Sequence, residues 1–399
     1  MTDRCVLAYS GGLDTSVAIG WLKDKYGAEV IAMAVDVGQG VDEDLLHARG
    51  EACGAAEVIV VDAREEFARD FALPALRANA LYMGKYPLVS ALSRPLIVKH
   101  LVRVAREKAA KYVAHGCTGK GNDQVRFEVA TAALAPDLVT LAPVRDAGLT
   151  RDAAIEYAEE RSLPVPVTKS SPYSIDENLW GRTIECGVIE DPWVSPPQDA
   201  YEWTVAPENA PDEPDVLTIS FESGNPVTID GVGGSAADLM AQVARRAGAH
   251  GIGRIDMIED RLIGIKSREV YEVPGAVTLI TAHRDLEDLT LERSLASFKR
   301  GMEPVYADLV YNGLWYSPLR RALDAFIADS QRPVTGDVRM RLYRGAATVE
   351  GRRAPQALYE HGLATYEAGD RFDHDAAAGF VKLWGLPLKV WSERQGEGR

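Results

Sequence analysis

The sequence predicts an α/β fold in which an N-terminal parallel sheet is followed by a C-terminal α+β part and a C-terminal helical arm. Short apolar runs alternate with helical patterns up to about residue 161. Paired strand-like runs joined by turns begin near residue 216, and an apolar, helix-like stretch lies near the end of the chain. We therefore divide the chain into residues 1–168, 169–360 and 361–399.

The first part contains apolar runs that we interpret as strands, at residues 4–9, 29–35, 57–61, 112–117 and 138–142. Helical patterns lie between and after them, at residues 15–26, 64–79, 95–111, 123–134 and 151–161. Strands without polar alternation are buried on both faces, which is typical of a parallel sheet. Ligands bind such sheets at the carboxyl ends of the strands. Polar clusters follow the predicted strands there, at residues 10–16, 36–40, 116–123 and 143–146.

Prolines interrupt the helical pattern at residues 163–172, and residues 192–214 predict an irregular surface segment. The following part predicts hairpins at residues 216–232, 254–266 and 338–350, the second with strands 254–259 and 262–266. In the tail, residues 376–383 are helix-like and precede Pro387. This stretch is either an arm that packs on a neighbouring subunit or a helix docked on its own chain.

Composition excludes several classes of protein. The formal net charge of −15 disfavours nucleic acid as a partner. No apolar run is long enough to span a bilayer, and the N-terminus lacks the pattern of a signal peptide, so we expect no membrane association and a cytoplasmic protein. The four cysteines and seven histidines lack metal-ligand spacing, so we expect no structural metal.

The segment Ala8-Tyr9-Ser10-Gly11-Gly12-Leu13-Asp14-Thr15-Ser16 lies between a predicted strand and a predicted helix. Its two glycines allow a tight turn and leave backbone N–H groups bare. The helix N-terminus adds unsatisfied donors and partial positive charge, and the hydroxyls of Ser10, Thr15 and Ser16 add more donors. The segment therefore predicts a phosphate-binding loop. The alternative is an ordinary turn in which Asp14 or Ser10 caps the helix.

A second glycine-rich segment, residues 115–128, follows the fourth predicted strand. Asn122 or Asp123 is expected to cap the next helix, and Arg126 would emerge one turn later, where its fork suits a carboxylate. The Asn122 amide offers both a donor and an acceptor, and Thr118 and Asp123 suit the carboxylate and ammonium of an amino acid. The alternative is a glycine-rich loop followed by an ordinary surface arginine.

The first segment differs from the Walker A and dinucleotide-binding patterns and resembles the S-G-G-x-D-[ST] loop of the PP-loop ATP pyrophosphatases. Together with the second segment, it closely resembles the argininosuccinate synthase family. The resemblance spans essentially the whole chain. It includes further matching runs at residues 36–40, 94–96, 165–168, 172–174, 190–193, 266–268 and 271–272.

The resemblance implies an ATP-dependent ligase that condenses citrulline and aspartate, in arginine biosynthesis and the urea cycle, through a citrullyl-adenylate, releasing AMP and pyrophosphate. It implies a PP-loop, Rossmann-like nucleotide-binding domain at 1–168, a synthetase domain at 169–360 and an oligomerisation arm at 361–399. It also implies a homotetramer, and Mg²⁺ bound with the ATP phosphates.

Site residues carry over motif by motif. Residues that would bind ATP are Ala8, Tyr9, Ser10, Gly11, Gly12, Leu13, Asp14, Thr15, Ser16, Val35 and Gly116. Residues that would bind the amino-acid substrates are Tyr86, Thr118, Asn122, Asp123, Arg126, Ser174, Thr183, Glu259 and Tyr271, with Thr118, Asn122 and Asp123 on aspartate. Asp14, Asp123 and Arg126 are the candidates for catalysis. Ala91 replaces a serine common in the family, so that citrulline contact stays unassigned, with Ser90 and Ser93 nearby.

Two other functions remain open on the sequence. One is a tRNA-thiolating enzyme of the same superfamily, which would need a basic surface and paired catalytic cysteines. The other is a non-catalytic nucleotide-binding module, which leaves the large second domain unexplained.

Overall fold

The computed structural model describes residues 2–148, 151–163, 173–367 and 369–396. The chain forms two compact units, residues 1–356 and 357–399, and each is described by itself. The expected break at residues 163–172 lies almost wholly outside the described residues.

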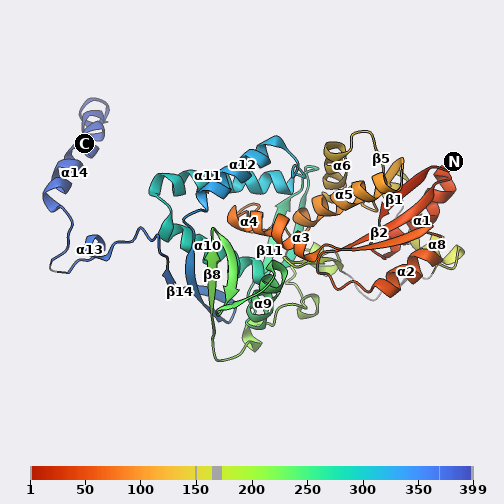
Figure 1. Cartoon of the computed structure of the whole chain (residues 1–399), viewed down its shortest axis with the longest axis horizontal. Coiled ribbons are helices and arrows are strands. Elements are labelled where there is room, and N and C mark those ends of the chain that lie inside the picture. The colour runs from red at the N-terminus through yellow and green to blue at the C-terminus, as the bar shows by residue number, and fades with distance from the viewer. Residues whose placement is uncertain (1, 149–150, 164–172, 368, 397–399) are drawn as a thin grey trace. The chain divides into compact units, whose positions relative to one another are not determined.

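The N-terminal part contains a five-stranded parallel sheet (Figure 1). Its strands are β1 (Arg4–Ala8), β2 (Glu29–Asp36), β3 (Glu57–Asp62), β4 (Tyr112–Ala114) and β5 (Val139–Leu141), in the spatial order β3-β2-β1-β4-β5. The strand order reverses at β1, so the sheet has its switch point between β1 and β4. The prediction of a parallel sheet is confirmed, and ligands bind such sheets at that point.

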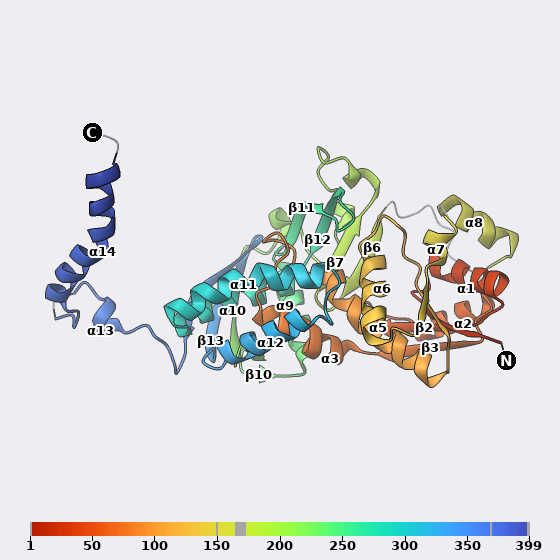
Figure 2. The same ribbon diagram turned by 90° about the horizontal axis from the view of Figure 1, so that it is seen from above.

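Helices cover both faces of this sheet because its strands are apolar on both sides. Val6, Ile31 and Met33 belong to a core shared with α5 (Val89–Glu107), whereas Cys5 and Leu7 belong to a core shared with α1 (Leu13–Tyr26) and α2 (Glu43–Ala52). Figure 2 shows α1 and α5 on the two sides of the strands. The remaining helical segments of this part are α3 (Arg64–Phe67), the π-helical turn Ala68–Ala72, α4 (Leu73–Arg77), α6 (Asp123–Leu134), α7 (Pro143–Asp146) and α8 (Arg151–Glu160).

Helix α5 begins six residues before the predicted start at Pro95 and contains that proline. Contacts from distant residues hold the turn ahead of it. Trp180 Nε1 donates to the carbonyl of Pro87 at 2.8 Å, and Asn178 Nδ2 donates to the carbonyl of Val89 at 2.9 Å. Tertiary hydrogen bonds therefore override the boundary that the proline predicted.

The C-terminal part of the first unit is α+β, and its sheets are antiparallel, as predicted (Figure 1). One sheet has the order β11-β12-β7-β6, from β6 (Ser174–Asn178), β7 (Gly181–Glu185), β11 (Arg254–Asp260) and β12 (Lys266–Glu272). The other has the order β10-β9-β8-β13-β14, from β8 (Asp215–Glu222), β9 (Asn225–Ile229), β10 (Val232–Gly233), β13 (Gly336–Tyr343) and β14 (Ala346–Arg353).

Helices α9 (Ala236–Ala249), α10 (Pro274–Thr290), α11 (Arg293–Tyr311) and α12 (Pro318–Ser330) complete this part, with short 3-10 turns at Gly187–Glu190, Gln198–Ala200 and Pro207–Asn209. The predicted strand at residues 262–266 is wrong. Residues 261–265 form the turn of that hairpin, and the strand begins at Lys266. Strand β12 pairs on both sides, so Tyr271 lies inside the sheet, where it is 2% exposed.

The second unit contains α13 (His361–Ala364) and α14 (His374–Gln395). Helix α14 is longer than the predicted stretch and continues through Pro387. None of its residues is buried within its own unit, and Trp384 is 73% exposed. Among the described residues, no helix combines the length and apolar character needed to cross a bilayer.

Candidate active site

The glycine loop connects β1 to α1 at the carboxyl edge of the parallel sheet. Gly11 has φ +75°, and a Cβ atom there would lie 2.4 Å from Leu46 Cδ2, so both the conformation and the space require glycine. Gly12 is the N-cap of α1, and its backbone N–H donates to Ser10 Oγ at 3.4 Å. The loop presents backbone donors of the kind that bind phosphate.

A cavity of about 700 Å³, here called the loop cavity, lies over this segment. Six of the residues that we predicted to bind ATP line it: Ala8, Tyr9, Ser10, Thr15, Val35 and Gly116. Gly116 approaches α1 closely, because a Cβ atom there would lie 2.9 Å from Thr15 Cγ2. The Ser10 and Thr15 hydroxyls lie 3.1 Å apart and contact each other.

Other predicted residues of the loop do not line this cavity. Gly11, Gly12, Leu13 and Asp14 form the turn and the first turn of α1. Ser16 is fully buried, and its hydroxyl lies 3.4 Å from that of Tyr9 inside the core. The expected hydroxyl donor from Ser16 therefore does not reach the cavity.

A second cavity of about 880 Å³ lies between the glycine-rich segment before α6 and the sheet that contains β7 and β12. All nine residues that we predicted to bind the amino-acid substrates line it: Tyr86, Thr118, Asn122, Asp123, Arg126, Ser174, Thr183, Glu259 and Tyr271. They come from widely separated parts of the chain, so the fold brings together what the sequence distributes. Four residues, Ser90, Asp123, Ser174 and Glu185, line both cavities, which are therefore adjacent.

At one end of the second cavity, hydroxyl groups hold a buried carboxylate. Glu259 is 3% exposed and accepts hydrogen bonds from the hydroxyls of Tyr271 and Tyr311, the latter at 2.8 Å. Burial raises the pKa of Glu259, and the two hydroxyls partly offset that effect. Tyr86 stacks on Tyr271 with ring centroids 4.2 Å apart. This end combines a fixed acceptor with aromatic walls, which suits an ammonium group.

Asn122 is the N-cap residue of α6, but its side chain does not cap the helix as we expected. Its Nδ2 donates to the Tyr311 hydroxyl at 2.8 Å, and its Oδ1 accepts from the Leu262 backbone N–H at 2.9 Å. The amide therefore ties α6 to α11 and to the turn after β11.

Two arginines hold Asp123 between the cavities. Arg94 Nε donates to Asp123 Oδ2 at 2.9 Å, and Arg126 Nη1 donates to Oδ1 at 2.7 Å. Arg94 also binds both oxygens of Asp176. Burial opposes ionisation of Asp123, but the two guanidinium groups outweigh burial and lower its pKa to about 2. Arg126 also donates to the Tyr311 carbonyl at 3.0 Å, so its fork here holds protein groups.

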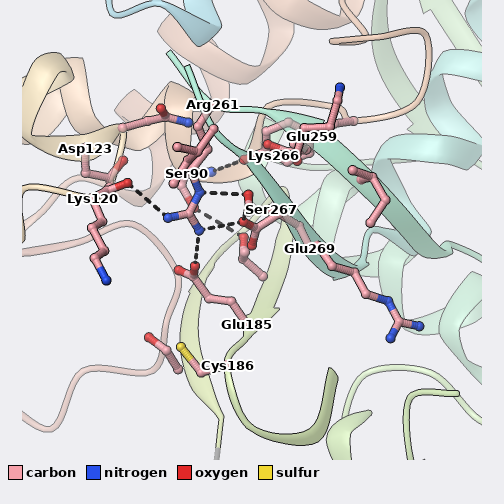
Figure 3. Close-up of a pocket in the computed structure, with 18 of the residues that line it drawn as sticks. Ser90, Lys120, Asp123, Glu185, Cys186, Glu259, Arg261, Lys266, Ser267 and Glu269 are labelled. Carbon is pink, nitrogen blue, oxygen red and sulfur yellow. Dashed lines mark hydrogen bonds and ion pairs between the residues drawn. The ribbon is translucent and has the colours of Figure 1, made fainter. Parts of the chain in front are cut away.

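A different cluster borders the second cavity at the end of β7 (Figure 3). Arg261 Nη2 donates to Glu185 Oε2 and to Glu269 Oε1, both at 2.7 Å, so one guanidinium serves two carboxylates. Burial and the nearby negative charge of Glu269 raise the pKa of Glu185 to about 7, against the opposing effect of Arg261. A carboxyl group with such a pKa can exchange protons at neutral pH.

The sequence analysis assigned no role to several residues that shape the cavities: Arg94, Asp176, Glu185, Arg261, Glu269 and Tyr311. A signal existed for some of them, because alternate residues of a strand share a face. Asp176 follows Ser174 by two residues, and Glu185 follows Thr183 in the same way. Tyr311 had no such signal, since it ends helix α11 far from the other residues.

The fold and the site together define a class of protein. A parallel sheet with a glycine loop at its switch point, next to a second cavity lined by charged and hydroxyl side chains, is the arrangement of an α/β nucleotide-binding protein. Family models agree with this assignment. The N-terminal HUP domain of argininosuccinate synthase matches residues 4–164, and the C-terminal domain of the same enzyme matches residues 173–391.

The chain belongs to the argininosuccinate synthase family. It is a ligase that forms a carbon–nitrogen bond by ATP-dependent condensation of citrulline with aspartate, in arginine biosynthesis.

Proposed function

We propose that the loop cavity binds ATP, that the second cavity binds citrulline and aspartate, and that the reaction proceeds through a citrullyl-adenylate. A ureido carbon is a poor electrophile and its oxygen a poor leaving group. Attack of that oxygen on the α-phosphate releases pyrophosphate and converts the oxygen into part of a phosphate leaving group. Attack of the aspartate amine on the activated carbon then expels AMP. Such a route requires alignment and charge stabilisation more than a protein nucleophile.

The observation that carries this proposal is the adjacency of the two cavities. All nine predicted substrate residues line one cavity, and it shares four residues with the cavity over the glycine loop. A ureido group in the second cavity would therefore lie close to a nucleotide in the first. Two separate ligand sites without shared residues would not support transfer between them.

Individual roles follow from the contacts. The loop from Ala8 to Ser16, with Val35 and Gly116, would hold the nucleotide through backbone groups and hydroxyls. The carboxylate of Glu259, which the hydroxyls of Tyr271 and Tyr311 hold in place, would accept hydrogen bonds from the citrulline ammonium. Tyr86, Ser174 and Thr183 line the same cavity and would also contact citrulline. Thr118, Asn122 and Asp123 would bind aspartate, with Arg126 beside them. Ser90 is a further candidate for the contact left unassigned at Ala91, because its hydroxyl lies 3.3 Å from that of Thr183 on the cavity wall.

Mg²⁺ is part of the proposal as an ion that neutralises charge on the ATP phosphates. Among the described residues, no cluster of three or more His, Cys, Asp or Glu side chains could hold a metal. The Mg²⁺ ion would be ligated mainly by phosphate oxygens and water, as is usual for Mg²⁺ with nucleotides.

We also propose a homotetramer in the cytoplasm, with residues 1–168 as the nucleotide-binding domain, 169–360 as the synthetase domain and 361–399 as the oligomerisation arm. Helix α14 supports the arm, because it exposes apolar side chains that its own unit does not cover: Phe380, Val381, Leu383, Trp384, Leu386, Leu388 and Trp391. The four free cysteines fit a reducing compartment.

Pyrophosphate release tests the route. With ATP, citrulline and aspartate, the protein should release pyrophosphate and AMP in equal amounts with the product. Citrulline and ATP without aspartate should still support exchange of labelled pyrophosphate into ATP, because the adenylate forms first. Pyrophosphate release that does not require citrulline would contradict the proposal.

The substitution Asp14→Ala tests the loop. Asp14 lies in the first turn of α1, where a carboxylate stabilises the helix start that presents the phosphate-binding N–H groups. We expect the KM for ATP to rise about tenfold, equivalent to ~1.4 kcal/mol of binding. Asp24→Ala, in the last turns of the same helix, is the matched control and should leave that KM unchanged. Equal KM values for the two variants would argue against the loop as the phosphate site.

A further inference from the structure

The second half of the proposed reaction requires a proton acceptor at the boundary between the two cavities. The aspartate amine is largely an ammonium group at neutral pH and has no free electron pair until it loses a proton. The atom that it attacks lies where the nucleotide and citrulline meet. Among the described residues, only two carboxylates, Asp123 and Glu185, line both cavities.

Asp123 is a poor acceptor. Each of its oxygens already receives a hydrogen bond from an arginine, at 2.9 Å from Arg94 and at 2.7 Å from Arg126. Burial disfavours its charge, yet the two guanidinium groups lower its pKa to about 2. A carboxylate with that pKa stays ionised at neutral pH and hardly takes a proton from an ammonium group. Asp123 is therefore suited to binding positive charge.

Glu185 has the opposite properties. Arg261 binds only its Oε2, at 2.7 Å, and no donor among the described residues contacts its Oε1. Its side chain keeps 36% of its surface exposed at the cavity wall. Figure 3 shows Glu185 and Asp123 on different sides of Arg261. One oxygen is thus fixed by the protein, and the other is open to a ligand.

The other carboxylates near the cavities lack one of these features. Glu259 receives a hydroxyl on each oxygen and lines only the second cavity. Glu269 Oε1 takes both Arg261 and the Ser267 hydroxyl, and Glu269 also lines only the second cavity. Asp176 lines only the loop cavity and is bound on both oxygens by Arg94.

We propose that Glu185 is the general base that takes a proton from the aspartate ammonium, an inference that rests on the adenylate route proposed above. The proton moves to the carboxylate, and the freed electron pair forms the bond to the activated ureido carbon. The bond from that carbon to the bridging oxygen breaks, and AMP leaves with its electron pair. The second proton of the same nitrogen passes to the released phosphate, leaving the product as a guanidinium ion.

The charges around Glu185 fit this role. It faces Glu269 on β12, Arg261 in the turn after β11 and Asp123 at the start of α6. Burial and the negative neighbours raise its pKa to about 7, while Arg261 opposes them. A base with a pKa near the working pH combines a useful ionised fraction with a useful affinity for the proton. The condensation rate should therefore fall as the pH drops below about 7, because Glu185 becomes protonated.

The substitution Glu185→Gln separates the two half-reactions. Gln keeps the shape of the side chain and can accept the Arg261 hydrogen bond, but it cannot take the proton. Citrulline-dependent exchange of labelled pyrophosphate into ATP, measured without aspartate, should stay within about threefold of the parent protein. Argininosuccinate formation should fall by about 100-fold or more. The condensation rate that remains should no longer fall as the pH drops below 7.

Two further variants sharpen the test. Glu185→Asp keeps a carboxylate but retracts it, so it should recover part of the condensation rate together with the acid decline. Glu269→Gln removes the neighbouring negative charge and keeps Glu185, so it should retain condensation and move the acid decline to lower pH.

The outcomes are distinguishable. Glu185→Gln protein that loses both half-reactions equally, or that retains condensation with its acid decline, would overturn the role of Glu185 as a base. Parent protein that forms argininosuccinate but shows no citrulline-dependent exchange would contradict the adenylate route, and with it this inference.

Discussion

Asp123 and Glu185 line the same two cavities, but the arginines around them are distributed in opposite ways. Asp123 has two arginines on its oxygens, whereas Glu185 shares one arginine with Glu269. Burial raises the pKa of both carboxyl groups. The guanidinium groups reverse that effect for Asp123, with a pKa of about 2, and not for Glu185, with a pKa of about 7.

The difference teaches that the ratio of arginines to carboxylates, more than burial alone, divides the tasks of the two acids. A carboxyl group that is bound by two arginines stays ionised and can bind a cation. A carboxyl group that shares a single arginine with a second carboxylate holds a proton for part of the time at neutral pH and can exchange it. The two clusters also give opposite linkage to folding. Asp123 adds stability above pH ~4 that is lost as the pH falls towards 2, whereas Glu185 lowers stability as the pH rises from ~4.5 through 7.

Of the substitutions that test this comparison, Arg94→Met should have the largest effect, a loss of stability. The variant leaves Asp176 without its arginine and Asp123 with only Arg126, so buried negative charge is no longer compensated. We expect a loss of about 3 kcal/mol in the free energy of unfolding at pH 7, measured by urea denaturation.

Arg103→Met is the matched control on the same helix. Arg103 forms an exposed pair with Glu107, so its loss should cost below about 0.5 kcal/mol. Equal losses for the two variants would show that the Asp123 cluster does not depend on its second arginine.

Arg261→Gln should have an intermediate effect, which is a change in the pH dependence of the condensation rate. Without this arginine, Glu185 and Glu269 keep their mutual repulsion and lose the charge that opposes it. The pKa of Glu185 should rise further, so the acid decline of the condensation rate should move up by about one pH unit.

Arg246→Gln provides the matched control, because Arg246 also binds two carboxylates, Asp215 and Asp230, away from the cavities. Its loss should leave the acid decline where it was. An unmoved decline in Arg261→Gln would mean that this arginine does not set the proton affinity of the site.

The smallest effect should appear in the stability of Glu185→Gln. Ionising Glu185 in the folded protein is unfavourable between pH 5 and 8, and Gln removes that penalty. Relative to the parent protein, the variant should gain on the order of 1 kcal/mol in unfolding free energy between these pH values, since partial exposure screens the effect. Glu190→Gln, a change at an exposed residue on the same cavity wall, should show no such gain. A gain of similar size in both variants would contradict the assignment of the raised pKa to Glu185.

Local patterns sufficed for much of the fold. Apolar runs predicted the five parallel strands, and the glycine loop was recognisable because turn geometry and helix-end donors depend on neighbouring residues. Resemblance to the family supplied the candidate substrate residues from Tyr86 to Tyr271, and they line one cavity. Period-two alternation could have added Asp176 and Glu185, but nothing in the sequence indicated that Arg94 would reach Asp176 across 82 positions.

The sequence by itself determined the parallel sheet, the glycine loop after its first strand and the chemical types of side chain available near it, because these depend on short-range periodicity and backbone freedom. Only the tertiary structure decided that helix α5 continues through Pro95, that Tyr271 lies inside a sheet, and that Arg261 reaches two glutamates from different strands. Burial and charge pairing are properties of distances in space. The proton affinities of Asp123 and Glu185, and so their different tasks, exist only once the chain has folded.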